Sequence, residues 1–289
     1  MISSVKVHQD AKRTRLLPLL NPIHIVDSLY RNRELILNLT KRDVSSTYQG
    51  SFLGALWTII VPLLMMLLYT FVFSVVFHAK WDTGSSQPTP PGEYALILYA
   101  GLTAFNVFSS VMGRAPGLVL AVPNYVKKVV FPLEILPVVA TGSALITALI
   151  NVILVLIGSI LVYHAVSPTV LLLPLVFIPL ILLTLGSAWF LSSLSVFVRD
   201  IGQAISIIVQ VLFFLTPIVY SANTVPPNLR FLLALNPLAS IIDGFRRTLI
   251  WGTMLDWKGW IIVTLVSAVV AIFGFAWFSA TKRGFADVM

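Results

Sequence analysis

The sequence contains no cysteine and few charged residues. The absence of cysteine excludes disulfide bonds, thiol nucleophiles and iron–sulfur ligands. Only 10% of the 289 residues are charged and 58% are hydrophobic, whereas about a quarter of the residues in a typical soluble domain are charged. This composition is typical of a membrane protein.

Motifs for binding nucleotides or metals are also missing. No G-x-x-x-x-G-K-[ST] occurs, so the chain does not bind ATP phosphates through a P-loop. The four histidines are scattered without metal-ligand spacing, and we expect this chain to bind no metal and no cofactor. The long apolar tracts contain no Asp or Glu, which argues against a proton- or sodium-coupled carrier.

Apolar tracts free of charge predict an all-α membrane protein with six spanning helices. A helix needs about 20 apolar residues to cross the hydrocarbon core. The tract from 135 to 198 is too long for one helix, and the turn-like YHAVSP at 163–168 divides it. Residues 1–52 then form a cytoplasmic N-terminal segment, and 53–289 form the membrane domain. We expect spans near 53–77, 94–112, 135–162, 171–198, 201–220 and 260–280.

The segment between the fifth and sixth spans has a different pattern. Its apolar pieces, such as FLLAL, are interrupted by NTVPPN and NP and are too short to cross a bilayer. They predict one or two short re-entrant or gate helices, because broken backbone within a membrane must be buried in protein or lie against water.

Lysine and arginine predict the orientation. With the N-terminus inside, the inner segments carry 14 of the 19 basic residues and the outer segments carry 5. Eight lie in the first 43 residues, which have no signal-peptide pattern. We expect a multi-pass inner-membrane protein with both termini in the cytoplasm.

Two segments on the expected inner side have more than one interpretation. Residues 22–42 mix apolar and charged side chains and predict an interfacial amphipathic helix, which either anchors to lipid alone or also contacts a cytoplasmic partner. The loop from Arg114 to Phe131 includes a short apolar helix candidate between Pro116 and Pro123. It is either an ordinary basic loop or a lever for a motor subunit.

Five sequence blocks, in this order, resemble the membrane subunit of a type-2 ABC transporter. The similarity is to the branch that exports lipid-linked polysaccharides such as O-antigen, capsule or teichoic acid. The chain departs at Thr47, where family members often carry Arg. The blocks are KRDVSSTYQGSFLGALW (41–57), NYVKKVVFPLEILP (124–137), RD (199–200) with FLTPIVY (214–220), NPLASIIDGFR (236–246) and GFAD (284–287).

The resemblance implies a half-transporter that is not itself an enzyme. Two copies would form the pore, and two copies of a cytoplasmic ATPase subunit would supply ATP and Mg. The substrate would be a lipid-linked glycan, with the bilayer as surroundings and no nucleic acid as partner. The residues expected to contact the ATPase are Arg31, Arg33, Glu34, Arg42, Asp43 and Asn124.

A polysaccharide path calls for two kinds of side chain. Aromatic rings offer flat apolar faces along which a glycan can slide, although any of them could be an ordinary core or lipid-facing residue. A carrier pyrophosphate needs cations, although each cation could equally contact lipid headgroups; we place Arg246 near an outer gate. The aromatic candidates are Tyr69, Phe71, Phe73, Phe213, Phe214 and Tyr220, and the cationic candidates are Lys41, Arg42, Lys127, Lys128, Arg246 and Arg247.

Two other functions remain open. The same fold could export a small hydrophobic molecule or a lipid. The chain could also be a membrane-embedded enzyme or assembly factor that needs no motor. A copurifying partner with ATPase activity would favour either exporter over the third possibility.

Overall fold

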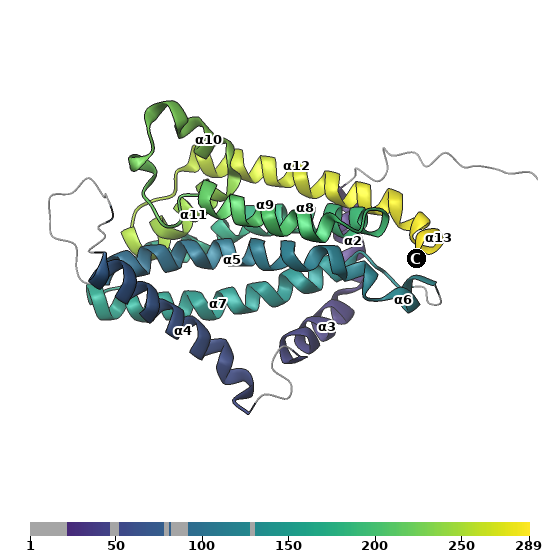
Figure 1. Cartoon of the computed structure of the whole chain (residues 1–289), viewed down its shortest axis with the longest axis horizontal. Coiled ribbons are helices and arrows are strands. Elements are labelled where there is room, and N and C mark those ends of the chain that lie inside the picture. The colour runs from purple at the N-terminus through teal and green to yellow at the C-terminus, as the bar shows by residue number, and fades with distance from the viewer. Residues whose placement is uncertain (1–21, 47–51, 78–80, 82–91, 128–130) are drawn as a thin grey trace, which may run out of the picture.

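The computed structural model describes residues 22–46, 52–77, 81, 92–127 and 131–289, and these segments are helical without any strand (Figure 1). Four of the described helices are long and apolar enough to cross a membrane. They are α5 (Glu93–Leu120), α7 (Ile135–Tyr163), α8 (Leu173–Phe197, entered through a 3-10 turn at Pro168–Leu172) and α12 (Trp257–Thr281).

Two shorter apolar helices occupy the positions of the first and fifth predicted spans. Helix α4 (Trp57–Tyr69) continues as a π-helix over Thr70–Val76, close to the predicted 53–77. Helix α9 (Ile201–Leu215) ends five residues before the predicted end at 220. Its 15 residues cover about 22 Å, less than the hydrocarbon core of about 30 Å.

The end of α9 follows from Thr216 and Pro217. The proline ring disfavours a helical conformation for the residue before it, and Thr216 is extended, with φ −98° and ψ 134°. The carbonyl groups beyond this point therefore have no helical partners and must be satisfied by other groups.

The body of the bundle is built around α5, which packs against α7, α8, α9 and α11. Almost every residue of α5 between Tyr94 and Phe108 is buried. Helices α8 and α12 cross closely at Gly186 and Gly274. A Cβ on Gly186 would lie 2.5 Å from the backbone of Val270, and a Cβ on Gly274 would overlap the carbonyl group of Gly186. These two helices can touch only because neither position carries a side chain.

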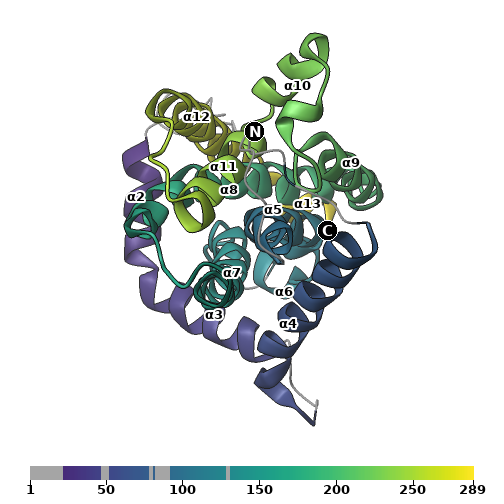
Figure 2. The ribbon, with the colours of Figure 1, turned by 90° about the vertical axis from the view of Figure 1, so that its left-hand side faces the viewer.

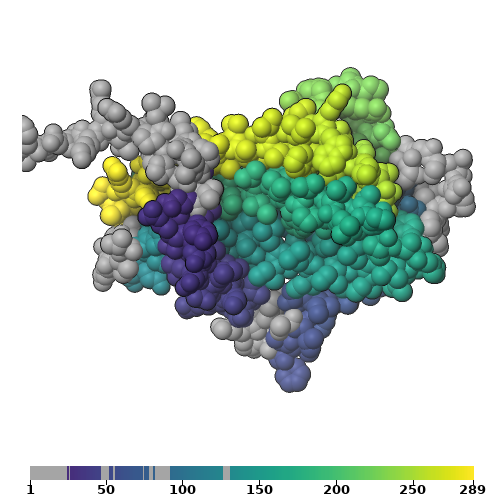
Figure 3. All heavy atoms as spheres, turned by 180° about the vertical axis from the view of Figure 1, so that it is seen from behind, coloured from purple at the N-terminus to yellow at the C-terminus, as the bar shows by residue number. Residues whose placement is uncertain are grey.

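One end of the bundle carries α6 (Pro123–Lys127) and the C-terminal α13 (Phe285–Val288), and we refer to it as the α6 end. Near it, the predicted amphipathic helix is in fact two helices, α2 (Pro22–Arg31) and α3 (Arg33–Ser46). Figure 3 shows them crossing the surface of the bundle near the C-terminus. The expected separate helix between Pro116 and Pro123 is wrong, because those residues up to Leu120 continue α5.

The opposite end carries α10 (Arg230–Leu235) and α11 (Pro237–Arg246), and we refer to it as the α10 end. Helix α11 extends as a π-helix over Arg247–Trp251. Its residues Leu238, Ile241, Ile242 and Phe245 are buried against the bundle. Short helices therefore lie between α9 and α12, in the segment for which re-entrant or gate helices were predicted.

Helices α4 and α9 lie on the same side of the molecule and flank α5, as the view along the bundle shows (Figure 2). Helix α4 diverges from α5 and α7 toward the α6 end (Figure 1). Its Leu67 is 64% exposed, and Phe214 of α9 is 69% exposed. Much of the apolar surface of these two helices contacts none of the residues that the structure describes.

Candidate functional site

Arg246 of α11 stabilises the non-helical backbone that follows α9. The Arg246 guanidinium donates to the carbonyl oxygens of Ile97 (3.2 Å), Pro217 (2.7 Å) and Ile218 (2.8 Å). It also lies 4.3 Å from the ring centroid of Trp81. Only 3% of Arg246 is exposed, so these carbonyl groups replace water as the partners of a buried cation.

Other polar side chains also form hydrogen bonds in this non-helical segment. The side-chain amide of Asn236 donates to Thr216 Oγ1 (2.8 Å). The side-chain oxygen Oδ1 of Asn236 accepts the backbone N–H of Leu238 (3.0 Å) and so caps α11. The Tyr94 hydroxyl donates to the carbonyl oxygen of Val219. The blocks FLTPIVY and NPLASIIDGFR, which are 15 residues apart in the sequence, therefore meet in space through specific hydrogen bonds.

The two outer cations expected to bind pyrophosphate lie in different settings. The guanidinium of Arg246 is committed to three carbonyl groups, so we do not retain a phosphate-binding role for it. Arg247 is half-buried and pairs with Asp243 one helical turn before it. Tyr220, expected along the path, donates its hydroxyl to the carbonyl oxygen of Phe214 (2.9 Å).

At the α6 end, an ion pair joins α3 to α5. Arg114 Nη2 lies 2.7 Å and 2.9 Å from the two carboxylate oxygens of Asp43. Partial burial acts to raise the pKa of Asp43, but hydrogen bonds from Arg114 and Ser143 and the positive charge of Arg114 outweigh it. The net effect lowers the pKa of Asp43, so the carboxylate remains charged at neutral pH.

A second connection at this end centres on Glu134, which is 9% exposed. Its carboxylate accepts a hydrogen bond from Ser28 of α2 (3.3 Å) and pairs with Lys282 after α12 (3.2 Å). Its carbonyl oxygen accepts the indole N–H of Trp189 in α8 (2.9 Å). The N-terminal helix, the segment before α7 and the end of α12 are thus joined through one residue.

The remaining residues expected to contact an ATPase lie mainly on the surface near the α6 end. Arg31 pairs with Asp27 (3.0 Å), and the Arg33 guanidinium stacks on the Tyr30 ring at 4.6 Å. Among the cations expected to bind pyrophosphate on the inner side, the side chain of Lys127 and all of Lys128 lie outside the described residues. Glu34, Lys41, Arg42 and Asn124 are exposed.

The aromatic candidates form two groups on either side of α5. On α4 and its π-helix, the Tyr69 and Phe73 rings are 6.3 Å apart, and Phe73 stacks on Tyr94 of α5 at 5.4 Å. On α9, the Phe213 ring meets Phe105 of α5 at 5.4 Å and Phe214 at 5.3 Å. The structure does not bring all six together; Phe71 and Phe214 point outward, with 57% and 69% exposure.

A row of polar residues along α5, which the sequence analysis missed, lies beside the group on α4. Its spacing of three or four places it along one face of the helix, and this spacing is the signal that could have identified it. With Ser143, Thr147 and Asn151 of α7, the row lines a cleft of about 390 Å³ beside α4. The row on α5 consists of Tyr99, Thr103, Asn106, Ser110 and Arg114.

Asn106 is the clearest polar feature of this face. It lies at the middle of α5, is exposed, and its side-chain amide makes no hydrogen bond with any described residue. Lipid-exposed polar groups are costly because hydrocarbon offers them no partners. The face of α5 that carries Asn106 is therefore suited to water, a polar substrate or a second copy of the chain.

The family model described as ABC-2 type transporter matches residues 34–250. The chain belongs to this family. The matched region begins in α3 and extends past Arg246. It therefore includes the Asp43–Arg114 pair, the polar row of α5 and the hydrogen bonds of Arg246 to the backbone.

Curated relatives of this ABC-2 family chain are named as export or transport proteins. The chain is 28% identical to the O-antigen export system permease protein RfbA of Myxococcus xanthus over 271 residues, covering 92% of this chain and 99% of that protein. It is 27% identical to the RfbA protein of Klebsiella pneumoniae over 261 residues, with 89% and 95% covered. It is also 23% identical to the polysialic acid transport protein KpsM of Escherichia coli over 214 residues, with 73% and 79% covered.

Proposed function

We propose that this chain is the permease half of an ATP-driven exporter that moves a lipid-linked, O-antigen-like polysaccharide from the cytoplasm across the inner membrane. The observation that carries the proposal is the polar row of α5 in the cleft beside α4. It has exposed amide and hydroxyl groups, and the neighbouring helices α4 and α9 carry the outward-facing rings of Phe71 and Phe214. Such a wall gives hydrogen-bonding partners to sugar hydroxyls and flat surfaces to their C–H faces. The names of the relatives support the same substrate class.

In this proposal, two copies of the chain face each other across this surface, and each is bounded by its α4 and α9. Six apolar helices lie in the membrane in each copy, and α9 extends through only part of its thickness. The segment from α10 to Trp251 enters the outer leaflet as a gate, and Arg246 holds the broken backbone in place. The α6 end, which carries the C-terminus, faces the cytoplasm, and we expect the N-terminus on the same side because of the excess of Lys and Arg on the expected inner side.

The proposed contact with two ATPase subunits, which bind ATP and Mg, involves α2, α3 and α6. Exposed charged and polar residues on these helices, including Arg31, Glu34, Arg42 and Asn124, offer the contact surface. Force on α3 reaches α5 through the Asp43–Arg114 pair, and force on α2 reaches α7 and α12 through Glu134. We also retain Lys41, Arg42, Lys127 and Lys128 as candidates for attracting the carrier pyrophosphate on the cytoplasmic side.

Deleting the gene and locating the glycan tests the function. We expect the polymer to accumulate inside the cell on its lipid carrier, with surface polymer restored by the wild-type gene. Surface polymer that is unchanged in the deletion strain would contradict the export function. Accumulation of a small hydrophobic compound instead would favour the alternative exporter.

A variant of Asn106 tests the position of the path. Asn106→Leu should reduce surface polymer several-fold while the amount of membrane protein stays normal, because the wall loses its exposed amide. The matched control is Thr264→Val in α12, where the lost hydroxyl bonds only its own helix at Trp260 (2.7 Å). Equal export by the two variants would place the path elsewhere.

A further inference from the structure

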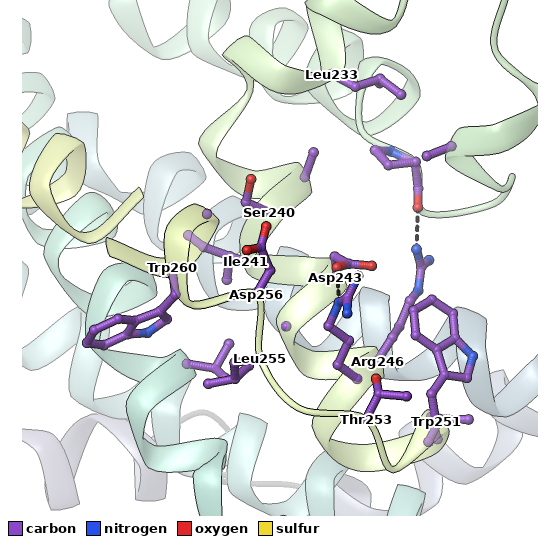
Figure 4. A pocket seen from close by; sticks show the side chains of 18 of the residues that line it. Leu233, Ser240, Ile241, Asp243, Arg246, Trp251, Thr253, Leu255, Asp256 and Trp260 are labelled. Atoms are coloured by element: carbon purple, nitrogen blue, oxygen red, sulfur yellow. Dashed lines mark hydrogen bonds and ion pairs between the residues drawn. The ribbon is translucent and has the colours of Figure 1, made fainter. Parts of the chain in front are cut away.

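A separate pocket of about 890 Å³ lies at the α10 end, bounded by α8, α10, α11 and the start of α12 (Figure 4). It shares no lining residue with the cleft beside α4. Its volume lies within the range of about 300–1,000 Å³ that is common for small-molecule sites. Exposed Ser240, Thr253 and Asp256 at its wall leave it open to the surroundings.

Aromatic and acidic side chains distinguish this pocket from an ordinary packing gap. It is lined by three tryptophans and three carboxylates, namely Trp81, Trp251, Trp260, Glu93, Asp243 and Asp256. Trp260 and Trp251 stand on either side of it, with Asp256 and Asp243 between them in the view of Figure 4. The two sides belong to different elements, because Trp251 ends the π-helix after α11 and Trp260 lies in the first turn of α12.

Several side-chain polar groups in the wall, including those of Trp251 and Asp256, make no hydrogen bond with the described residues. The indole N–H of Trp251 is buried and donates no hydrogen bond. An unsatisfied buried donor costs about 1–3 kcal/mol, and a ligand that accepts the bond recovers this energy. The Asp256 carboxylate makes no hydrogen bond or ion pair with a described residue, whereas Asp243 is held by Arg247.

This combination selects a ligand by its chemistry. A sugar ring presents an apolar C–H face to an indole and directs hydroxyl donors to a carboxylate. Arg246 and Arg247 also line the pocket, but backbone carbonyl groups and Asp243 already engage them. The charge of Asp256 therefore disfavours phosphates and acidic sugars, and a purely apolar ligand would leave that carboxylate without a partner.

We propose that this pocket binds one neutral or amino-sugar unit of a polysaccharide. That the sugar belongs to an exported polysaccharide rests on the proposed function. The pocket would then hold a sugar unit that has emerged at the α10 end and would oppose its return toward the cytoplasm. Asp256 and Trp251 supply the hydrogen bonds, and Trp260 supplies the stacking surface.

Ligand-observed NMR on the full transporter tests the proposal. The permease with its copurified ATPase is placed in nanodiscs, and saturation transfer is measured to the methyl glycosides of mannose, galactose, glucose and N-acetylglucosamine. We expect transfer to at least one glycoside, and a loss of at least five-fold in Asp256→Asn and in Trp260→Ala. Asp256 is exposed, so its variant keeps the test valid even if Trp260→Ala fails to fold.

Matched controls are available away from the pocket. Trp277→Ala removes a partly exposed indole of α12 that does not line the pocket, and Asp200→Asn removes a carboxylate before α9. Both should bind the glycoside as the wild type does. Absence of transfer to every glycoside, or equal loss in the controls, would overturn the proposal.

Glycerophosphoethanolamine serves as a competing probe. Transfer to it with none to the glycosides would make this a lipid-headgroup site and overturn the proposal. Export measured in the deletion strain is independent of these spectra. If the glycan still accumulates in that strain while no glycoside binds, only the pocket assignment fails and the exporter assignment stands.

Discussion

Helices α4 and α5 follow each other in the chain and are both strongly apolar, yet their surroundings differ completely. In α5, 83% of the most apolar window is buried within the chain. In α4, Leu64, Leu67 and Phe71 are each more than half exposed. Apolar composition therefore indicates that a helix avoids water, but it does not indicate whether the chain itself, lipid or a second copy covers that helix.

The same contrast separates the body of the molecule from its flanks. In the body, formed by α5, α7, α8, α11 and α12, close contacts and satisfied polar groups fix one arrangement. On the flanks, α4 and α9 keep exposed side chains on both sides of α5. Changes in the body should alter stability, and changes on the flanks should alter transport.

The largest expected effect on stability is at Arg246. Arg246→Met removes the side-chain donor from the buried carbonyl groups of Pro217 and Ile218, and a second donor from that of Ile97 in α5, and should cost about 3–5 kcal/mol. We expect little folded protein in the membrane and a lower thermal unfolding temperature in detergent.

Arg247→Met is the matched control, because Arg247 is half-buried and pairs only with Asp243 among the described residues. Its cost should stay below about 1 kcal/mol. Equal stability of the two variants would contradict the role of Arg246 as a clamp and would reopen its role at an outer gate.

The next largest effect should come from the contact of α8 with α12. Gly274→Ala places a methyl group against the carbonyl of Gly186 and should cost about 2–3 kcal/mol through forced separation of the helices. Gly113→Ala, which meets no atom within 4 Å, should instead be neutral or stabilise by up to about 1 kcal/mol. Thermal unfolding of both variants checks the opposite signs, and a common sign would show that helix propensity dominates the packing.

A smaller effect is expected where α3 meets α5. Asp43→Asn removes the ion pair with Arg114 and, because the pair is partly exposed, should cost no more than about 1 kcal/mol. Export should fall more than stability does if this pair transmits force. The doubly exchanged variant Asp43→Arg with Arg114→Asp should recover part of the export, and a double variant no better than the single ones would argue against the pair.

The difference in stability between the wild type and Asp43→Asn should depend on pH in a defined direction. The folded state lowers the pKa of Asp43, so its contribution to stability is complete above the unfolded value of about 3.9 and is lost as the pH falls through the folded value. The gap in unfolding temperature between wild type and Asp43→Asn should be constant from pH 7 to about pH 4 and should narrow below it. A gap that closes between pH 7 and pH 5 would show that Asp43 is not stabilised as a carboxylate.

The smallest effect on stability is expected for Phe214 on α9. Phe214→Ala should change the unfolding free energy of the protomer by less than about 0.5 kcal/mol, because the ring is mostly exposed. Its surface polymer should nevertheless decrease. Phe273→Ala, which removes a 58% exposed ring from α12 on another side of the bundle, should leave both quantities unchanged. Lost export in both variants would mean that exposed rings matter only for lipid contact.

The sequence predicted the helices well where apolar composition and length decide the outcome. Residues 135–162 were expected to span, and α7 runs over Ile135–Tyr163. The boundaries failed where tertiary partners decide. Helix α9 stops at Leu215 because Thr216 and Pro217 leave the helical conformation, and the donors that make this tolerable come from distant Asn236 and Arg246.

The candidate site was less accessible from the sequence. The aromatic residues of α4 and α9 were identified by type, but their grouping depends on α5, which separates them. The polar row of α5 is visible as a spacing of three and four, although only the structure shows that Asn106 and Ser110 are exposed while Tyr99 and Thr103 are buried. Arg246 was expected to meet a ligand because a sequence cannot show that three backbone carbonyls already surround it.

The three carbonyl partners of Arg246 also imply an order of events during biogenesis. Ile97 belongs to α5, whereas Pro217 and Ile218 follow α9, so the cation finds its full set of acceptors only after both helices have been inserted and have come together. Before that moment, the guanidinium group must stay hydrated at the membrane surface. The segment of α10 and α11, which carries Arg246, should therefore be the last part of the chain to reach its folded position. Chains stalled at this step should be accessible to proteases near residue 246.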